Sequence, residues 1–127
     1  MESKPGILLV VRAWWQLLLY DLVDAVAGFH GVHAMMRRTV VAERRRADLC
    51  EIRAALCWAR SLYGKRVFCL QVSVAATRLL RQMGVDAQLV VGYRSTPFFG
   101  HAWVEVDGTV FNDSPVYQQA LTCLLRV

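Results

Sequence analysis

The sequence predicts an α+β fold, in which N-terminal helices are followed by a small antiparallel sheet. Apolar residues recur every three or four positions as far as Gly84, which is the spacing of amphipathic helices, and beyond it they alternate as in strands. Asp107-Gly108 is a typical two-residue turn of a β-hairpin. Because 127 residues suit one domain, we expect a single domain, 1–127, with a helical part at 1–64 and a further helix plus the sheet at 65–127.

The helical part contains three expected helices. The first runs from about Leu8 to Ala27 and stops near Gly28, and residues 30–33 follow as a connector. A second helical stretch leads from about Ala34 into a cluster of arginines. The third runs from about Ala47 to Leu62, because its apolar residues lie three or four positions apart.

The first expected helix is apolar around most of its circumference. Arg12 and Gln16 leave only a narrow polar stripe, and Trp14 and Trp15 lie among the apolar residues. Such a helix is usually buried, so we expect core packing; a partner surface is the second interpretation and peripheral membrane contact the third. We expect no transmembrane segment, because a spanning helix needs about 20 nearly uncharged residues and Arg12, Gln16 and Asp21 interrupt this one.

The part from residue 65 onward is expected to begin with a linker and a fourth helix. Lys65 to Phe68 form the linker, and the helix begins at Cys69 and ends at Gly84. The expected strands are Ala87–Tyr93, His101–Val106 and Thr109–Phe111, with a turn at 95–98 between the first two. The residues after Asp113 are weakly patterned, and no element is predicted there.

The chain is basic, with a formal net charge of +5. The excess lies mainly in arginines between residues 37 and 46, but Glu43, Asp48 and Glu51 interleave with them or follow them closely. This mixture is typical of a solvated helix face. No array of stacking aromatic residues and no groove-reading motif accompanies the arginines, so we expect no nucleic acid as a partner.

The four cysteines are Cys50, Cys57, Cys69 and Cys123. No two of them form a CxxC pair, so their spacing fits neither a zinc site nor an iron–sulfur site. We expect reduced thiols in a cytoplasmic protein, with Cys50 and Cys57 in the core. His30 and His33 are three positions apart with Gly31 between them, and no carboxylate follows at ligand spacing, so we expect no metal.

Cys69, His101 and Asp113 stand in the order of a thiol-hydrolase triad. At a helix start, unpaired backbone amides and the helix dipole favour a thiolate, and the Cys69 amide is itself a ready oxyanion donor. Strand periodicity places His101, Trp103 and Glu105 on one face, with Glu105 expected at the rim of the cleft. Taken singly, a packed thiol, a satisfied histidine and a turn-forming aspartate are commoner. Together, in this order, the three residues predict nucleophilic catalysis.

Residues that flank Cys69 and His101 are candidates for lining the substrate cleft. These candidates are Phe68, Gln71, Trp103 and Phe98. Gln71 is also a weak candidate for the second oxyanion donor, because its side chain carries an amide close to the nucleophile in the sequence.

The stretch from Cys69 to Asp113 resembles the stand-alone leader peptidases of lasso-peptide biosynthesis, members of the transglutaminase-like cysteine peptidase superfamily. The matching segments are Cys69-Leu70, Leu79-Leu80-Arg81, Gly84 to Gly92, Pro97-Phe98, His101 to Glu105, Asp107-Gly108 and Asn112-Asp113. The resemblance implies a transglutaminase-like or papain-like core with Cys69 as nucleophile, His101 as general base and Asp113 as its orienting partner. One departure is 71–73, where a more basic or polar continuation is expected, and it bears on substrate fit.

The function that the resemblance implies is removal of the leader from a ribosomally made lasso precursor peptide, through a thioester and without a cofactor. The implied partners are the precursor, a separate small leader-recognition protein and, after cleavage, the macrolactam synthetase that uses the freed amine. Two other interpretations of the same residues stay open, because a fold does not decide a reaction. One is an acyltransferase that passes the thioester to an amine, and the other is an inactive domain that binds a peptide. A basic nucleic-acid binder is the least favoured.

Overall fold

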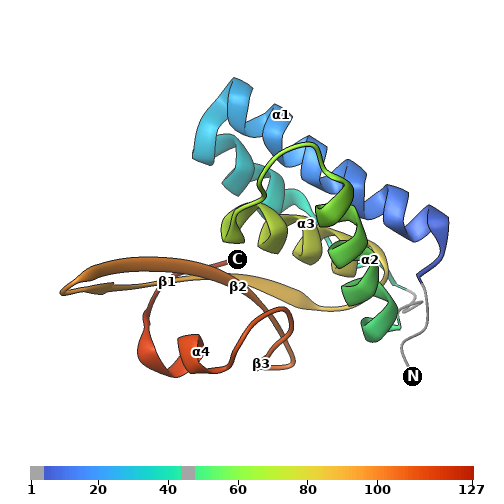
Figure 1. Cartoon of the computed structure of the whole chain (residues 1–127). Helices are drawn as coiled ribbons and strands as arrows, with labels where there is room; N and C mark the ends of the chain where they lie inside the picture. Colours follow the sequence, from blue (N-terminus) through green and yellow to red (C-terminus); the bar gives the residue numbers. More distant parts are fainter. Residues whose placement is uncertain (1–4, 44–47) are drawn as a thin grey trace.

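Three helices make up the N-terminal part of the molecule (Figure 1). The computed structural model describes residues 5–43 and 48–127. The helices are α1 (Ile7–Arg38), α2 (Leu49–Leu62) and α3 (Cys69–Gln82). The Asp48 side chain caps α2 by accepting hydrogen bonds from the amides of Cys50 and Glu51. The expected continuation of the second helix into 44–46 and the expected helix start at Ala47 lie outside the described residues.

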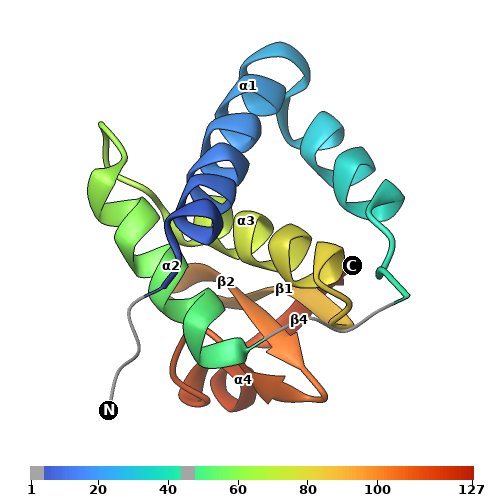
Figure 2. The same ribbon diagram turned by 90° about the vertical axis from the view of Figure 1, so that its right-hand side faces the viewer.

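Helix α1 is interrupted at Gly28, where the backbone has φ 61° and ψ −160°. Glycine reaches this region without a steric penalty, and the predicted stop near Gly28 is confirmed. The predicted connector at 30–33 is wrong, because the helix resumes directly after the glycine. A single residue is enough to redirect the chain, so α1 consists of a first arm (7–27) and a second arm (29–38) that diverge from the bend (Figure 2).

The first arm of α1 buries one face and exposes the others. Its buried residues are Leu9, Ala13, Gln16 and Leu17. Trp14 and Trp15 stay 37% and 49% exposed, so the expectation that the whole helix packs in the core is wrong. Gln16 turns inward because Arg78 of α3 donates a hydrogen bond to its side-chain oxygen, which gives the buried amide a partner. No helix in the described part of the chain is long and apolar enough to cross a bilayer.

The sheet contains four antiparallel strands in the order β3-β2-β1-β4. The strands are β1 (Ala87–Ser95), β2 (Phe98–Val106), β3 (Thr109–Val110) and β4 (Thr122–Arg126). Helix α3 packs on the β1–β2 hairpin from one side, and the short helix α4 (Val116–Ala120) lies on the other side of the sheet (Figure 1). The predicted α+β class, with helices first and a small antiparallel sheet after them, is confirmed.

The sequence does not predict β4 or α4. Strand β4 pairs with β1 through its backbone, but its side chains are mostly exposed. An edge strand of this kind shows no alternation of buried and exposed residues, which is the pattern that identifies a strand. Helix α4 has five residues and none of them is buried, so it is too short to show a helical period.

Side chains of β2 divide between the two faces of the sheet. Ala102, Val104 and Val106 pack with residues of the helices, as the strand period predicts. Trp103 packs on the opposite face, where Leu121 covers it. The sheet therefore has a second, smaller core on the side of α4.

All four cysteines are free thiols. Cys50 and Cys57 are exposed on α2, so their predicted burial is wrong. They lie seven residues apart and share one side of the helix. The buried side of α2 consists of Ile52, Ala55, Leu56 and Ala59.

Candidate active site

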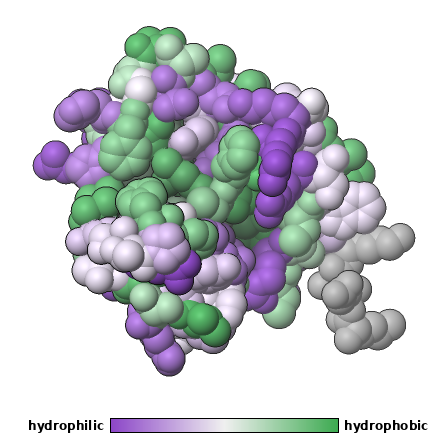
Figure 3. Space-filling model, turned by 60° about the vertical axis from the view of Figure 1, so that its left-hand side comes forward, coloured by the Kyte–Doolittle hydropathy of each residue, from purple (hydrophilic) through white to green (hydrophobic). Residues whose placement is uncertain are grey.

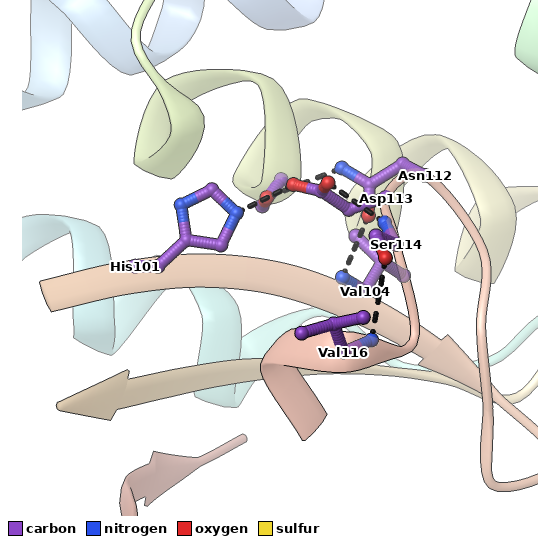
Figure 4. A network of polar contacts seen from close by, with 7 residues as sticks. His101, Val104, Asn112, Asp113, Ser114 and Val116 are labelled. Atoms are coloured by element: carbon purple, nitrogen blue, oxygen red, sulfur yellow. Dashed lines mark hydrogen bonds and ion pairs between the residues drawn. The ribbon is translucent and has the colours of Figure 1, made fainter. Parts of the chain in front are cut away.

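His101 of β2 and Asp113, in the loop after β3, form a hydrogen-bonded pair (Figure 4). Nε2 of the imidazole lies 2.5 Å from Oδ2 of the carboxylate. The other carboxylate oxygen accepts a hydrogen bond from the Ser114 amide at 2.7 Å. Both carboxylate oxygens therefore have a partner, and the orientation of the carboxylate toward the imidazole is set from two sides. The two side chains meet as the sequence predicts.

The residue before Asp113 fastens this loop to β2 and α3. Oδ1 of Asn112 accepts a hydrogen bond from the Val104 amide at 2.9 Å, and Nδ2 donates to Ser73 Oγ at 3.4 Å. Asn112 thereby continues the pairing along β2 after β3 has ended, and it ties that edge to the buried Ser73 of α3. The sequence predicts no role for either residue; Asn112 appears only as part of the matching segment Asn112-Asp113, and Ser73 only as part of the departure at 71–73.

Aromatic rings surround the imidazole of His101. The Tyr117 ring of α4 lies 4.2 Å away between centroids, and the rings of Phe99 and Trp103 lie at 6.0 Å and 6.3 Å. This packing restricts rotation of the imidazole. Since Asp113 engages Nε2, Nδ1 is the nitrogen left to exchange a proton with another group. Nδ1 has no hydrogen-bond partner among residues 5–43 and 48–127.

Cys69 is the first residue of α3, and its thiol is half-buried. The N-cap residue Phe68 makes no side-chain hydrogen bond to the helix, so it supplies no acceptor for the amides of the first turn. The thiol packs in the apolar cluster that includes Ala102, the neighbour of His101. Within the described residues, it makes no hydrogen bond to His101 or Asp113. The structure thus joins the imidazole to the carboxylate and places Cys69 in the apolar cluster that contains the neighbour of His101.

The linker that leads into Cys69 is fastened to α1. Lys65 Nζ lies 2.9 Å from Oδ1 of Asp21, and the Tyr63 hydroxyl donates to the other oxygen of the same carboxylate. Burial raises the pKa of Tyr63, and the hydrogen bond and charge of Asp21 raise it further, to about 12. Burial alone raises the pKa of Asp21, but hydrogen bonds from Tyr63 and Lys65 outweigh it and lower that pKa. These contacts anchor both ends of the turn between α2 and the linker.

Tyr20 of α1 is a neighbour of Cys69 that the sequence does not reveal. Both side chains pack against the same apolar cluster. Burial raises the pKa of the Tyr20 phenol, and the charges of Asp24, Asp21 and Cys69 raise it further. A neutral hydroxyl therefore lies near the thiol. No sequence pattern marks it, because residues 20 and 69 approach each other only through tertiary packing.

Two of the four expected cleft residues are buried. Gln71 donates from Nε2 to the Leu17 carbonyl of α1 at 2.9 Å, so its amide is not free to serve as an oxyanion donor. Trp103 is also buried, because Tyr117 of α4 and Leu121 pack on its face of the sheet. Neither residue lines an open cleft, and both expectations are wrong in this respect. Phe68 and Phe98 are 63% and 78% exposed, and they keep the accessibility that a cleft residue needs.

Glu105 is buried in an ion pair rather than placed at a cleft rim. Its Oε1 lies 2.7 Å from Arg126 of β4, and its Oε2 accepts a hydrogen bond from Trp103 Nε1 at 2.8 Å. Burial by itself raises the pKa of Glu105, but the hydrogen bonds from Arg126 and Trp103 outweigh it, so the pKa is lowered from its ordinary value. The rim expectation is wrong because β4, which supplies the arginine, is not visible in the sequence pattern.

His30 and His33 lie in the second arm of α1, where the His33 ring stacks on Phe29 with the centroids 6.2 Å apart. In the part of the chain that the structure describes, no three His, Cys, Asp or Glu side chains gather as a metal site would require.

Large apolar side chains are exposed on several elements. They include Ile7, Leu8, Val26, Leu62 and Leu124. On the face drawn in Figure 3, apolar surface occupies a central depression, and hydrophilic side chains border it. Apolar surface with a polar border is typical of sites that bind another molecule.

Comparisons with known proteins place the chain in a family. A sequence model described as the transglutaminase-like superfamily matches residues 15–126. The microcin J25-processing protein McjB of Escherichia coli is 42% identical over 59 residues, which are 46% of this chain and 28% of McjB. The chain thus spans less than a third of the length of McjB. No solved structure matches this chain. These findings confirm the resemblance drawn from the motifs. Since the family match runs from the first arm of α1 to the last strand, the chain belongs to the transglutaminase-like superfamily.

Proposed function

We propose that this protein is a cysteine endopeptidase that removes the leader from a ribosomally made lasso precursor peptide. The observation that carries the proposal is the His101–Asp113 pair. It engages Nε2 and leaves Nδ1 without a hydrogen-bond partner among the described residues, and His101 lies on the strand that packs against α3. Cys69 stands at the start of α3. The similarity to a protein named for processing microcin J25 supports a peptide as the substrate.

The proposed reaction begins when the Cys69 thiol gives its proton to Nδ1 of His101. The thiolate attacks the carbonyl carbon at the leader–core junction, and the oxyanion forms beside the Cys69 amide at the start of α3. His101 then protonates the departing amine of the core, and the leader stays behind as a thioester. The same imidazole deprotonates water, which hydrolyses the thioester and releases the leader carboxylate. Asp113 holds the ring through Nε2 and stabilises its positive charge.

By the same proposal, a separate small protein recognises the leader and delivers the precursor. A macrolactam synthetase then joins the freed amine to a carboxylate. We place these steps in the cytoplasm, where free thiols such as the four in this chain stay reduced.

Competition among the four cysteines for iodoacetamide tests the proposal. Cys50, Cys57 and Cys123 are exposed and Cys69 is half-buried, so exposure alone predicts that Cys69 reacts last. An ordinary thiol is almost fully protonated at pH 6, whereas a thiolate paired with an imidazolium reacts there. At pH 6 we expect Cys69 to be labelled at least about tenfold faster than the other three, and His101→Ala to abolish this advantage. Rates that follow exposure and ignore His101→Ala would contradict the proposal.

Cleavage itself is measured by mass spectrometry on the precursor of microcin J25, with the Cys69→Ala variant as the control. Hydrolysis yields a leader that ends in a free carboxylate. Acyl transfer to an added amine, such as glycine methyl ester, yields a leader that ends in an amide. The mass of the leader therefore distinguishes a peptidase from a transferase that uses the same residues.

A further inference from the structure

The two arms of α1 and the C-terminal half of α3 enclose an open groove of about 560 Å³. Its lining residues come from both arms, from the residues that follow the second arm and from α3, and Figure 2 shows the two arms diverging over α3. Val23 on the first arm and Met35 on the second give it apolar walls, and Arg38 and Arg78 contribute the charged lining. The residues that line the groove include no carboxylate.

Arg78 is the cation that α3 contributes to the lining of the groove. Its Nε donates to Thr39 Oγ1 at 3.1 Å, and a second nitrogen donates to the Gln16 side chain. Both acceptors are neutral. Burial lowers the pKa of Arg78, and within 5–43 and 48–127 no Asp or Glu lies at ion-pair distance from it. An anion stabilises a partly desolvated guanidinium that has no counter-ion more than it stabilises a fully hydrated guanidinium.

Further cations surround the groove. Arg38 borders it and, together with Arg37 and Ala34, lines an adjoining hollow of about 290 Å³. Arg12 reaches the groove residue Gln82 from the first arm, with a donor–acceptor distance of 3.4 Å. The charge and the apolar walls together fit a ligand that carries carboxylates and at least one apolar side chain.

The groove is close enough to Cys69 for one peptide to reach both. Val23 and Met35 pack against the same apolar cluster as Cys69. Along α3, nine positions separate Cys69 from Arg78, which corresponds to about 14 Å at the rise of an α-helix. Nine positions are about two and a half helical turns, so the two side chains lie on opposite sides of α3 and are also separated by about 10 Å across the helix. An extended peptide spans the combined distance with about five or more residues.

We propose that this groove binds an acidic segment of the peptide substrate, about five or more residues from the bond that is cleaved. Its carboxylates lie against Arg78 and Arg38, and an apolar side chain lies between the two arms of α1. The identity of the ligand as substrate rests on the proposed function, whereas binding to the groove does not require catalysis.

The test is fluorescence anisotropy with a fluorescein-labelled nonapeptide of alternating leucine and glutamate. A matched peptide has glutamine in place of every glutamate, and the protein carries Cys69→Ala so that nothing is cleaved. We expect the glutamate peptide to bind with a Kd that rises with salt, and the glutamine peptide to bind at least about tenfold more weakly. Arg78→Gln should weaken binding about tenfold and Arg38→Gln about threefold. Arg94→Gln removes the same charge from an exposed arginine near the end of β1, outside the groove, and should change nothing.

Equal Kd values for the two peptides would overturn the proposal, and so would equal effects of Arg38→Gln and Arg94→Gln. Arg38 is exposed and makes no hydrogen bond to the described residues, so its substitution keeps the test valid where Arg78→Gln unfolds the protein. Displacement of the probe by a single-stranded oligonucleotide of equal charge at equal concentration would also overturn it, because the groove would then select charge alone. The two proposals can fail separately. If the groove binds the glutamate peptide as expected but Cys69 of the wild-type protein reacts with iodoacetamide no faster than the other cysteines, only the proposed function is refuted.

Discussion

Gly92 of β1 is a position where one added methyl group should disturb both the fold and the candidate site. A Cβ placed there would lie 2.7 Å and 2.9 Å from two carbons of the Trp103 indole, and 3.0 Å from the Cβ of Leu121. These separations are shorter than the ~3.5–4.0 Å at which carbon atoms attract each other. Gly92 is also the cross-strand partner of His101, so any local shift of β1 is transmitted to the imidazole.

The indole has little freedom to move away from the new methyl group. Trp103 is buried against Leu121, and its Nε1 donates to Glu105 at 2.8 Å. Overpacking a well-filled site costs about 1–3 kcal/mol. Because the obstacle is a rigid ring and a backbone-attached carbon rather than a flexible side-chain end, we expect Gly92→Ala to lower the free energy of unfolding by about 2–3 kcal/mol. In a domain of this size each kcal/mol corresponds to a fall in Tm of about 3–6 °C.

The measurement is urea unfolding followed by tryptophan fluorescence. Gly100→Ala is the matched control, since a Cβ at Gly100 meets nothing closer than 3.9 Å. In a Trp103→Phe background, which lacks the two clashing carbons, the cost of Gly92→Ala should shrink by at least about 1 kcal/mol. Equal stability of the Gly92→Ala and Gly100→Ala variants, or an unchanged cost in the Trp103→Phe background, would refute the steric argument.

The stability that Glu105 supplies should be lost on acidification. The pKa of Glu105 is lowered in the folded state, so its contribution to stability is present above the unfolded pKa and disappears as the pH falls through the folded pKa. Glu105→Gln should therefore flatten the pH dependence of the urea midpoint between about pH 5 and pH 3. An unchanged dependence of the midpoint on pH would contradict this. Because Asn112 positions the loop of Asp113, Asn112→Ala should lower kcat for precursor cleavage by about tenfold or more, with a smaller change in KM. An unaltered kcat would show that the loop keeps its position without the Asn112 side chain. In an ultraviolet titration, one of the four tyrosines should ionise only near pH 12 and be missing from Tyr63→Phe; a wild-type titration complete by pH 11 would contradict the burial of its hydroxyl against Asp21.

Much of the fold and of the candidate site follows from short stretches of sequence. The start of α3 at Cys69, the bend at Gly28 and the hairpin turn at 107–108 are set by residues within a few positions of each other, because helix periods and turn conformations are local properties. The His101–Asp113 pair was predictable for the same reason, since it spans one hairpin.

Burial and partnership depended on residues far apart in the chain. Gln16, a polar residue, is buried because Arg78 arrives from α3, while the tryptophans beside it stay exposed. Gln71 is taken up by a carbonyl of α1, and Glu105 is paired by a strand with no pattern of its own. In each case a partner more than 20 positions away in the sequence satisfies or covers the side chain. Only the tertiary structure determines that environment, because burial and hydrogen bonding depend on what packs against a residue and not on its neighbours in the chain.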